Sequence, residues 1–254
     1  ATMARIVSTI PGMIPLSGLP GGGCGPSKAS HVEERFRRDF SNFSVNEILV
    51  LFSEGLETIT SLEIRTLYQN ENLPVALEQL SVANITTLFN NHANLIGSQI
   101  TGFLQRNINF VRAISNFNPN GVLALVRQFN SRANMSEDIA RALLDNPVFK
   151  ECLSSLKDYQ LSDLLNQANL IRIFDINSAR EVLRNNNFNQ VSPNIGLEAL
   201  SSFINNDAFM QALNTDNCIS IVKNLNLQTV IRQSLNQNGM LNLLRSDIIL
   251  QRGT

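Results

Sequence analysis

An internal repeat constrains this chain more than any other feature of its sequence. Six copies of a pattern place apolar residues at a starting position, which we call the anchor, and then four, 12 and 16 positions later. The first five anchors advance by about 38 residues, an interval typical of stacked helical units. The anchors are Phe36, Leu73, Phe110, Phe149, Phe188 and Phe209.

Four copies also share an asparagine three residues before the anchor and an apolar residue six residues before it. These asparagines are Asn70, Asn107, Asn146 and Asn206. The first copy has Glu33 at this place, and the copy anchored at Phe188 keeps Asn185 but is broken by Ser192 and Pro193. Phe209 follows Phe188 early, so we expect the last copies to be compressed.

Within each copy, the apolar positions fit two helices joined by a short turn. Those from ten residues before the anchor to four after it follow the spacing of one helical face, and the remaining two fit a second helix. No long stretch alternates between apolar and polar residues, so no sheet is predicted. The sequence therefore predicts an all-α array of about five to six helical hairpins, which stack because one hairpin cannot bury its apolar face.

The recurring asparagine has two interpretations. It could form a ladder of hydrogen-bonding groups for a ligand, or it could mark a break between two short helices, because asparagine competes with the helical backbone for hydrogen bonds. Asn146 precedes Pro147, and the residue before a proline is disfavoured in a helix. We favour the break, which would give each unit three short helices in place of two long ones.

Composition indicates a folded chain of nearly balanced charge. The 254 residues are 43% hydrophobic and include 20 Lys and Arg against 21 Asp and Glu. Binding to a phosphate backbone needs clustered positive charge, so we expect no nucleic-acid partner. No apolar run reaches the length of about 20 residues that a membrane span needs. Residues 1–30, rich in Pro and Gly, predict an irregular arm or linker, and residues 31–254 predict a single all-α domain.

Residues that commonly carry chemistry are few and scattered. Cys24, Cys152 and Cys218 have no paired spacing, so neither a zinc site nor a disulfide framework is indicated. Cys24, in the arm, is expected to be exposed and to form an intermolecular disulfide if the protein is secreted. His31 and His92 lie far apart, and no catalytic motif surrounds either. The sequence therefore predicts no catalytic residues, no metal site and no cofactor, and it indicates that the protein is not an enzyme.

Two segments carry a pattern found in a known family. They are residues 143–153 (LLDNPVFKECL), followed by Tyr159 and by the leucines at 164–165, and residues 103–110 (FLQRNINF). The pattern resembles the repeat of the insect-allergen family typified by cockroach allergens. This resemblance implies a helical, secreted protein that encloses an apolar cavity holding lipid. A fainter likeness, to the helical repeat domains of spider silk proteins, rests on polar uncharged helices beside a Pro/Gly-rich arm.

Two functions fit these features. The leading one is a non-catalytic interaction or self-assembling structural unit, with the arm as a docking segment and a protein partner or a second copy as ligand. The alternative is a carrier that encloses lipid or another apolar ligand. The rings that would line its cavity are those of Phe103, Phe110, Phe149, Phe203 and Phe209. These rings would fill a dry core in a scaffold and surround a void in a carrier.

Overall fold

The computed structural model describes residues 14–15, 36–130 and 134–234. Contacts between Cα atoms group the chain into two compact units. Unit 1 contains the residues up to Leu88 together with His92–Phe110, and unit 2 contains Phe89–Asn91 together with the residues from Val111 on.

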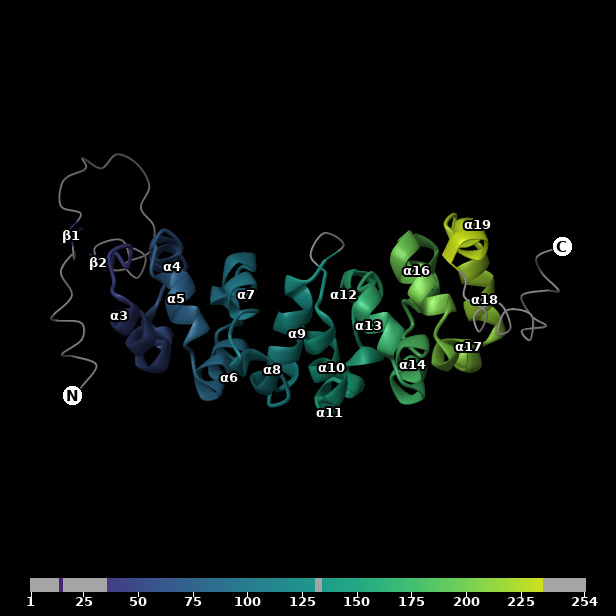
Figure 1. The fold of residues 1–254 in the computed structure, drawn as a ribbon, viewed down its shortest axis with the longest axis horizontal. Coiled ribbons are helices and arrows are strands. Elements are labelled where there is room, and N and C mark those ends of the chain that lie inside the picture. The colour runs from purple at the N-terminus through teal and green to yellow at the C-terminus, as the bar shows by residue number, and fades with distance from the viewer. Residues whose placement is uncertain (1–13, 16–35, 131–133, 235–254) are drawn as a thin grey trace, which may run out of the picture. The chain divides into compact units, whose positions relative to one another are not determined.

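The described residues are almost entirely helical, which confirms the predicted all-α class (Figure 1). Their only strands are β1 (Ile14–Pro15) and β2 (Phe36–Arg37), which pair antiparallel with Ile14 opposite Arg37. This two-residue pairing departs from the expectation of no sheet. The rest of the predicted arm at 1–30 lies outside the described residues, and the single domain over 31–254 stays a prediction.

Short helices follow one another along the chain, coloured in order in Figure 1. Up to residue 114 they are α3 (Val45–Val50), η1 (Leu51–Gly55), η2 (Leu56–Thr58), α4 (Ser61–Tyr68), α5 (Leu73–Glu78), α6 (Val82–Asn91), η3 (Ala93–Leu95), α7 (Ser98–Leu104) and α8 (Asn109–Ile114). From residue 119 to residue 191 they are α9 (Pro119–Gln128), α10 (Glu137–Asp145), α11 (Pro147–Leu153), α12 (Asp158–Leu165), α13 (Ala168–Ile173), α14 (Ile176–Leu183) and α15 (Phe188–Val191). The last are η4 (Ser192–Asn194), α16 (Leu197–Ile204), α17 (Asp207–Ala212), α18 (Thr215–Val222), α19 (Leu227–Thr229) and η5 (Val230–Ser234).

Side-chain caps explain where many of these helices begin. Thr60 accepts a hydrogen bond from the backbone N–H of Glu63, and the Glu63 carboxylate accepts one from the Thr60 N–H, which forms a capping box at the start of α4. Ser136 caps α10 and Asp175 caps α14 in the simpler way, through one side-chain oxygen. The sequence thus restarts a helix at each cap, so none of the described helices is long.

The number of helices between successive asparagines differs from the expected hairpin. Four helices, α11 to α14, lie between Asn146 and Asn185, where the sequence suggested two, or three if the asparagine breaks a helix. Asn146 does break the helix, because its backbone is extended (φ −81°, ψ 115°) between α10 and α11. The expected hairpin unit is therefore corrected to a run of four short helices in this interval.

Packing in unit 2 follows a simple rule, in which each helix contacts the third helix after it. Helix α10 packs against α13, α11 against α14 and α12 against α15, and the rule continues through α13 with α16, α14 with α17 and α15 with α18 (Figure 1). The partners begin 27 to 31 residues apart. Three helices thus make one turn of a coil, and the core lies between successive turns.

Candidate interaction surface

A buried asparagine ties successive turns of the coil together. The side-chain Nδ2 of Asn146 donates hydrogen bonds to the carbonyl oxygens of Ile114 (2.7 Å) and Phe117 (3.1 Å), at and after the end of α8. Its Oδ1 accepts a hydrogen bond of 2.9 Å from the backbone N–H of Val148, in the first turn of α11. One side chain that is 1% exposed thereby satisfies carbonyls at the end of one helix and an N–H at the start of another. We call this arrangement an asparagine clamp.

The clamp recurs along both units with the same three bonds. The six clamp residues are Asn70, Asn107, Asn146, Asn185, Asn206 and Asn224. Each carbonyl that they bind lies 27 to 35 residues earlier, about one turn of the coil. Asparagine suits this place because it offers two donors and an acceptor on a short side chain. Both donors of each amide bind backbone, so the interpretation of these residues as a ligand-binding ladder is wrong.

A second asparagine reinforces four of the clamps. Two residues after the clamp, Asn72, Asn109, Asn187 and Asn226 each donate to one of the carbonyls that the clamp already binds. The residue between the two asparagines points outward. Ile108, between Asn107 and Asn109, is 81% exposed, and Leu225, at the corresponding place before Asn226, is 95% exposed. The clamps thus display two large apolar side chains to solvent.

The alignment of repeat copies within the sequence missed two buried amide residues, Asn224 and Gln167. Asn224 follows Asn185 by 39 residues, and it is flanked by buried Ile221 and Leu227 as in the other copies. Gln167 lies 39 residues before Asn206 and is 1% exposed. The same column of asparagines, extended past the anchor at Phe209, would have found Asn224. Gln167 is harder to find because its residue type differs.

These two residues correct the expectation that the last copies are compressed. Asn206 does not follow Asn185 in one column, because it clamps the end of α13 through Ile171, whereas Asn185 clamps the end of α11 through Leu153. Gln167 occupies the corresponding place one interval earlier, where its Nε2 donates to the carbonyl of Asn130. Between Asn146 and Asn185, and again between Asn185 and Asn224, a second helix junction therefore uses a buried amide, and Phe209 belongs to this second junction.

The interval between clamps and the turn of the coil have different lengths. Asn146, Asn185 and Asn224 lie 39 residues apart, whereas packed helices in unit 2 begin 27 to 31 residues apart. Each successive clamp in this series therefore stands one helix further around the coil, before α11, α15 and α19 in turn. Within unit 2, equivalent positions wind around the coil, so they do not line one face. A partner would meet non-equivalent residues along any single face.

The five phenylalanines predicted to line a cavity lie in the core or near it. Phe110 and Phe149 are 1% exposed, Phe203 and Phe209 are 0% exposed, and Phe103 is half-buried. The ring centroids of Phe203 and Phe209 are 4.3 Å apart. A ring that faced an open cavity would keep accessible surface, and three of these rings in unit 2 keep almost none. The carrier function stays a prediction, and it would require these rings to separate.

An aromatic row runs through the core of unit 2. Phe174 lies between Phe149 (centroids 6.3 Å apart) and Phe209 (5.4 Å), and Phe203 lies between Phe209 and Phe188 (6.0 Å). These contacts are edge-to-face, tilted or stacked, the arrangements that aromatic pairs favour. The row joins α11, α15, α16 and α17 through ring contacts. The turns of unit 2 are thus held together by these ring contacts as well as by the hydrogen bonds of the clamps.

A buried ion pair in unit 1 joins Arg38 to α4. The guanidinium of Arg38 binds the Glu63 carboxylate (Nε to Oε2, 2.5 Å) and also donates to the Thr58 carbonyl oxygen. The two charged side chains are 11% and 4% exposed. Burial pushes the pKa of Glu63 upward, but hydrogen bonds from Arg38 and from the Thr60 backbone outweigh burial, so its pKa lies below the usual range. The carboxylate is thus held charged.

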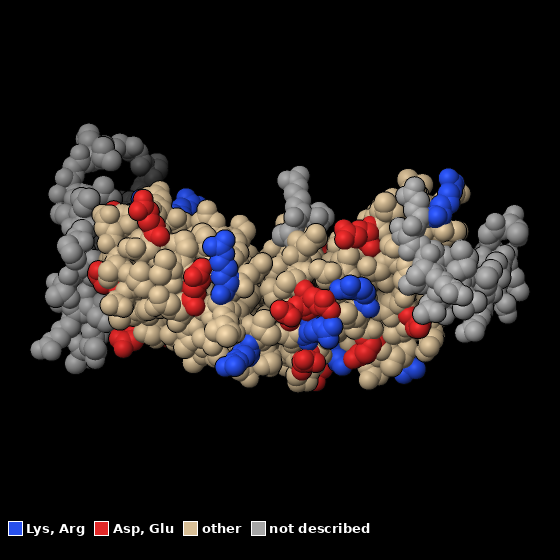
Figure 2. Space-filling model, viewed as in Figure 1, with Lys and Arg blue, Asp and Glu red and all other residues tan. Residues whose placement is uncertain are grey.

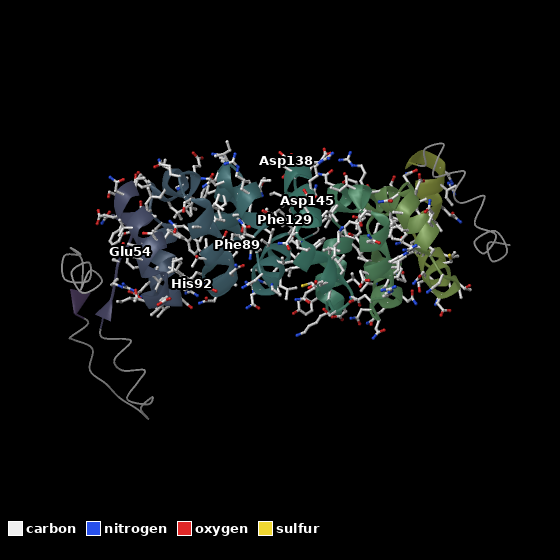
Figure 3. All side chains as sticks on the ribbon, turned by 90° about the horizontal axis from the view of Figure 1, so that it is seen from below. Glu54, Phe89, His92, Phe129, Asp138 and Asp145 are labelled. Atoms are coloured by element: carbon white, nitrogen blue, oxygen red, sulfur yellow. The ribbon has the colours of Figure 1, made fainter. Side chains whose placement is uncertain are left out.

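The predicted chemical residues form no cluster within the described part of the chain. His92 is half-buried at the end of α6 (Figure 3), Cys152 is half-buried, and Cys218 is 2% exposed. Burial raises the pKa of the Cys152 thiol, so this thiol is a weak nucleophile. Cys24 and His31 lie outside the described residues. Between residues 36 and 234, apart from 131–133, no group of three His, Cys, Asp or Glu could hold a metal ion.

The outer surface combines uncharged polar groups with isolated apolar ones. Most of the face drawn in Figure 2 carries neither acidic nor basic side chains, in keeping with the 16% of charged residues in the chain. Several ion pairs bridge successive turns, such as Lys150 with Asp175 (2.8 Å) and Glu137 with Arg172 (3.5 Å). No helix in the described ranges is both long and apolar enough to span a membrane. The candidate interaction surface is this mostly uncharged outer surface with its exposed apolar side chains.

The resemblances to insect allergens and to spider silk domains stay predictions. The comparisons with known proteins support neither one. No protein-family model, curated protein or solved structure matches this chain.

Proposed function

We propose that this protein is a non-catalytic structural repeat protein that associates with further copies of itself. The carrying observation is the exposure of large apolar side chains on turns whose buried clamp amides are hydrogen-bonded to the backbone. Leu225 is 95% exposed, while the amide of the neighbouring Asn224 is buried and binds the carbonyls of Ser192 and Ile195. A rigid turn thus presents an apolar side chain that the fold itself does not use.

The net charge and the surface composition of the protein favour self-association over a monomer in solution. The formal net charge is −1, and proteins near zero net charge repel one another weakly. Stacked helical repeats also present extended surfaces that suit protein binding. A surface of Asn, Gln and Ser with scattered apolar residues loses little solvation free energy on contact, because few charges must be stripped of water.

Mass measurement tests this function directly. The full chain, with a monomer mass of 28.2 kDa, is examined by native mass spectrometry and by light scattering across a wide range of concentrations. We expect discrete multiples of the monomer mass that become more abundant as concentration rises. A chain that stays monomeric at every concentration overturns the proposed function.

The carrier is a second candidate, favoured by the aromatic row of unit 2. Phe149, Phe174 and Phe209 lie in contact and offer a continuous apolar lining if the turns move apart. Organic extraction of the purified protein followed by lipid analysis tests it. Lipid at a fixed ratio to protein supports the carrier, and lipid-free protein contradicts it.

A further inference from the structure

An asparagine is followed by a glycine in the first turn of α9, the helix that begins after the N-cap residue Asn118 (Figure 1). The pair is Asn120–Gly121, and the side chain of Asn120 is exposed. Asparagine is among the chemically labile residues of proteins. It reacts most readily before glycine, because glycine has no side chain to hinder attack by its own nitrogen. The other Asn-Gly pair of the chain, Asn238–Gly239, lies outside the described residues.

The packing around α9 requires the glycine of this pair. A Cβ atom at residue 121 would overlap Asn90 Oδ1 and would lie 3.0 Å from Phe117 Cβ. Moving Asn90 aside would break a hydrogen bond of 2.9 Å, which its Oδ1 accepts from the backbone N–H of Asn118. Packing therefore accounts for the glycine, and the asparagine before it makes the pair labile.

The reaction open to this pair converts the asparagine to an acid. The backbone nitrogen of Gly121 attacks Cγ of Asn120 and forms a C–N bond. The side-chain nitrogen leaves as ammonia, which takes the proton of the Gly121 N–H. Water then opens the five-membered imide at one of its two carbonyl carbons, which gives either aspartate or isoaspartate. Water is the only co-reactant, and nothing is oxidised or reduced.

Two features of α9 oppose this attack. The N–H of Gly121 donates a hydrogen bond of 3.0 Å to Asn118 Oδ1, the side-chain cap of the helix, so the attacking nitrogen is already engaged. Asn120 also lies within α9, and its Cγ meets the nitrogen of Gly121 only if the backbone at residue 120 leaves the helical conformation. The reaction thus needs the first turn of α9 to open. Local openings of this kind require less free energy than global unfolding.

We propose that Asn120 is a modification site whose reaction is controlled by the opening of α9. While the first turn is closed the asparagine is protected, and each opening exposes the pair to attack. Isoaspartate adds one methylene group to the backbone beside the capped turn, so the turn no longer closes as before. A reacted Asn120 therefore marks a chain in which this turn has opened. The inference concerns a single chain and is independent of the proposed self-association.

Reaction rates test the control by α9. The full chain is incubated in mildly alkaline buffer, and samples are digested in mildly acidic buffer, where the reaction is slow. Mass spectrometry after chromatography then measures aspartate and isoaspartate in the peptide that contains residue 120. A synthetic peptide of residues 116–124 gives the rate without the fold. We expect the full chain to react more slowly than this peptide, and equal rates overturn the proposal.

Substitutions of the cap test the hydrogen bond to Gly121. Asn118→Ala removes the acceptor, and the usual contribution of an N-cap predicts that the open turn, and with it the rate at Asn120, increases about fivefold. Asn118→Asp keeps an acceptor at this position and is expected to react at the wild-type rate. An unchanged rate in Asn118→Ala overturns the proposal.

A matched control separates local opening from a general loss of stability. Asn214 caps α18 by the same kind of hydrogen bond, which it accepts from the N–H of Asn217. Asn214→Ala is therefore expected to weaken a helix start without changing the rate at Asn120. Equal acceleration by Asn214→Ala and Asn118→Ala overturns the assignment of the control to α9.

The stability of the reacted chain tests the consequence of the modification. Chains carrying Asn238→Gln, which removes the other Asn-Gly pair, are incubated, and those with isoaspartate at residue 120 are isolated. Urea unfolding compares them with unreacted chains and with Asn120→Asp in the same background. Asn120→Asp adds the same charge without the methylene group, and negative charge in the first turn of a helix is favourable. We expect the reacted chains to unfold at lower urea concentration than both references, and the same midpoint as Asn120→Asp overturns the inferred effect on the turn.

Discussion

The amide nitrogen of Asn146 lies 2.7 Å from the carbonyl oxygen of Ile114, a residue 32 positions earlier in the chain. This contact joins two turns of the helical coil at a point with no access to water. A helix end buried without such a partner would leave its carbonyl oxygens without hydrogen bonds. The clamp is therefore a condition for stacking one short helix on another.

Replacing the Asn146 amide by a carboxylate is expected to destabilise the protein strongly. Asn146→Asp keeps the oxygen that caps α11 but replaces both donors with oxygen lone pairs that face two carbonyls. Lost hydrogen bonds and buried unpaired groups together cost about 3 kcal/mol or more. Urea unfolding followed by circular dichroism measures the change. Asn186, an exposed asparagine beside the clamp residue Asn185, provides the control, since Asn186→Asp is expected to stay within about 0.5 kcal/mol. Similar losses for both variants would contradict the clamp.

Two glycines are expected to respond in opposite ways to alanine. A methyl group on Gly121 would overlap Asn90 Oδ1, which accepts the backbone N–H of Asn118, and would lie 3.0 Å from Phe117 Cβ. Gly121→Ala is expected to cost about 1–3 kcal/mol through overpacking. Gly102, in α7, has no atom within 4 Å of such a methyl group.

Gly102→Ala is accordingly expected to stabilise unit 1 by about 0.5–1 kcal/mol, because alanine loses less backbone freedom than glycine in a helix. Thermal unfolding of both variants checks the contrast. A Gly121→Ala protein as stable as the wild type would show that Asn90 can move aside without loss.

Acid is expected to weaken unit 1 through Glu63. In the unfolded chain the pKa of a glutamate carboxyl is about 4.3. The folded state holds the pKa of Glu63 below its unfolded value, so the unfolded state binds the proton more readily. The stabilisation is complete above the unfolded pKa and is lost as pH falls through the folded pKa. Unfolding free energies measured from neutral to acidic pH should therefore decline for the wild type.

Glu63→Gln removes this titration. Its deficit relative to the wild type is expected to be largest at neutral pH and to shrink in acid. Arg38→Met provides a second variant, which leaves the Glu63 carboxylate buried without its cation and is expected to be less stable at neutral pH than Glu63→Gln. A deficit of Glu63→Gln that does not change with pH would show that the charge of Glu63 is immaterial.

Truncating the aromatic row is expected to cost more than truncating a half-buried ring. Phe209 is 0% exposed and contacts two other rings, so Phe209→Ala should cost about 3–5 kcal/mol. Phe103 is half-buried, and Phe103→Ala should cost clearly less. Chemical unfolding of the two variants measures the difference. A small loss at Phe209 would indicate that its ring lies beside empty space, as the carrier function requires.

Much of the fold follows from local patterns. The three-and-four spacing of apolar residues predicts helices, and buried Phe110 and Phe149 fall on it. The break at Asn146 was also predictable, because asparagine before proline disfavours a helix. The number of helices per interval was not, since an apolar residue such as Leu170 fits either a turn or a third short helix until its neighbours are known.

The candidate surface was less predictable. The phenylalanines singled out as possible ligand contacts mostly face the core, and the exposed Leu225 lies in no predicted site. Its exposure follows from its place between Asn224 and Asn226, whose amides both turn inward to carbonyls of the preceding turn. The sequence shows the positions of the two asparagines, but it does not show which way their side chains point.

The sequence by itself determined that this chain forms short amphipathic helices and where an asparagine interrupts them, because helical periodicity and helix capping depend on residues a few positions apart. Only the tertiary structure decided that three helices make a turn while the clamps of unit 2 recur every four, and that Asn206 belongs to a different junction from Asn185. Those facts depend on which carbonyl, about 30 residues away, each buried amide reaches. Such a pairing is set by how whole helices pack, and no local pattern specifies it.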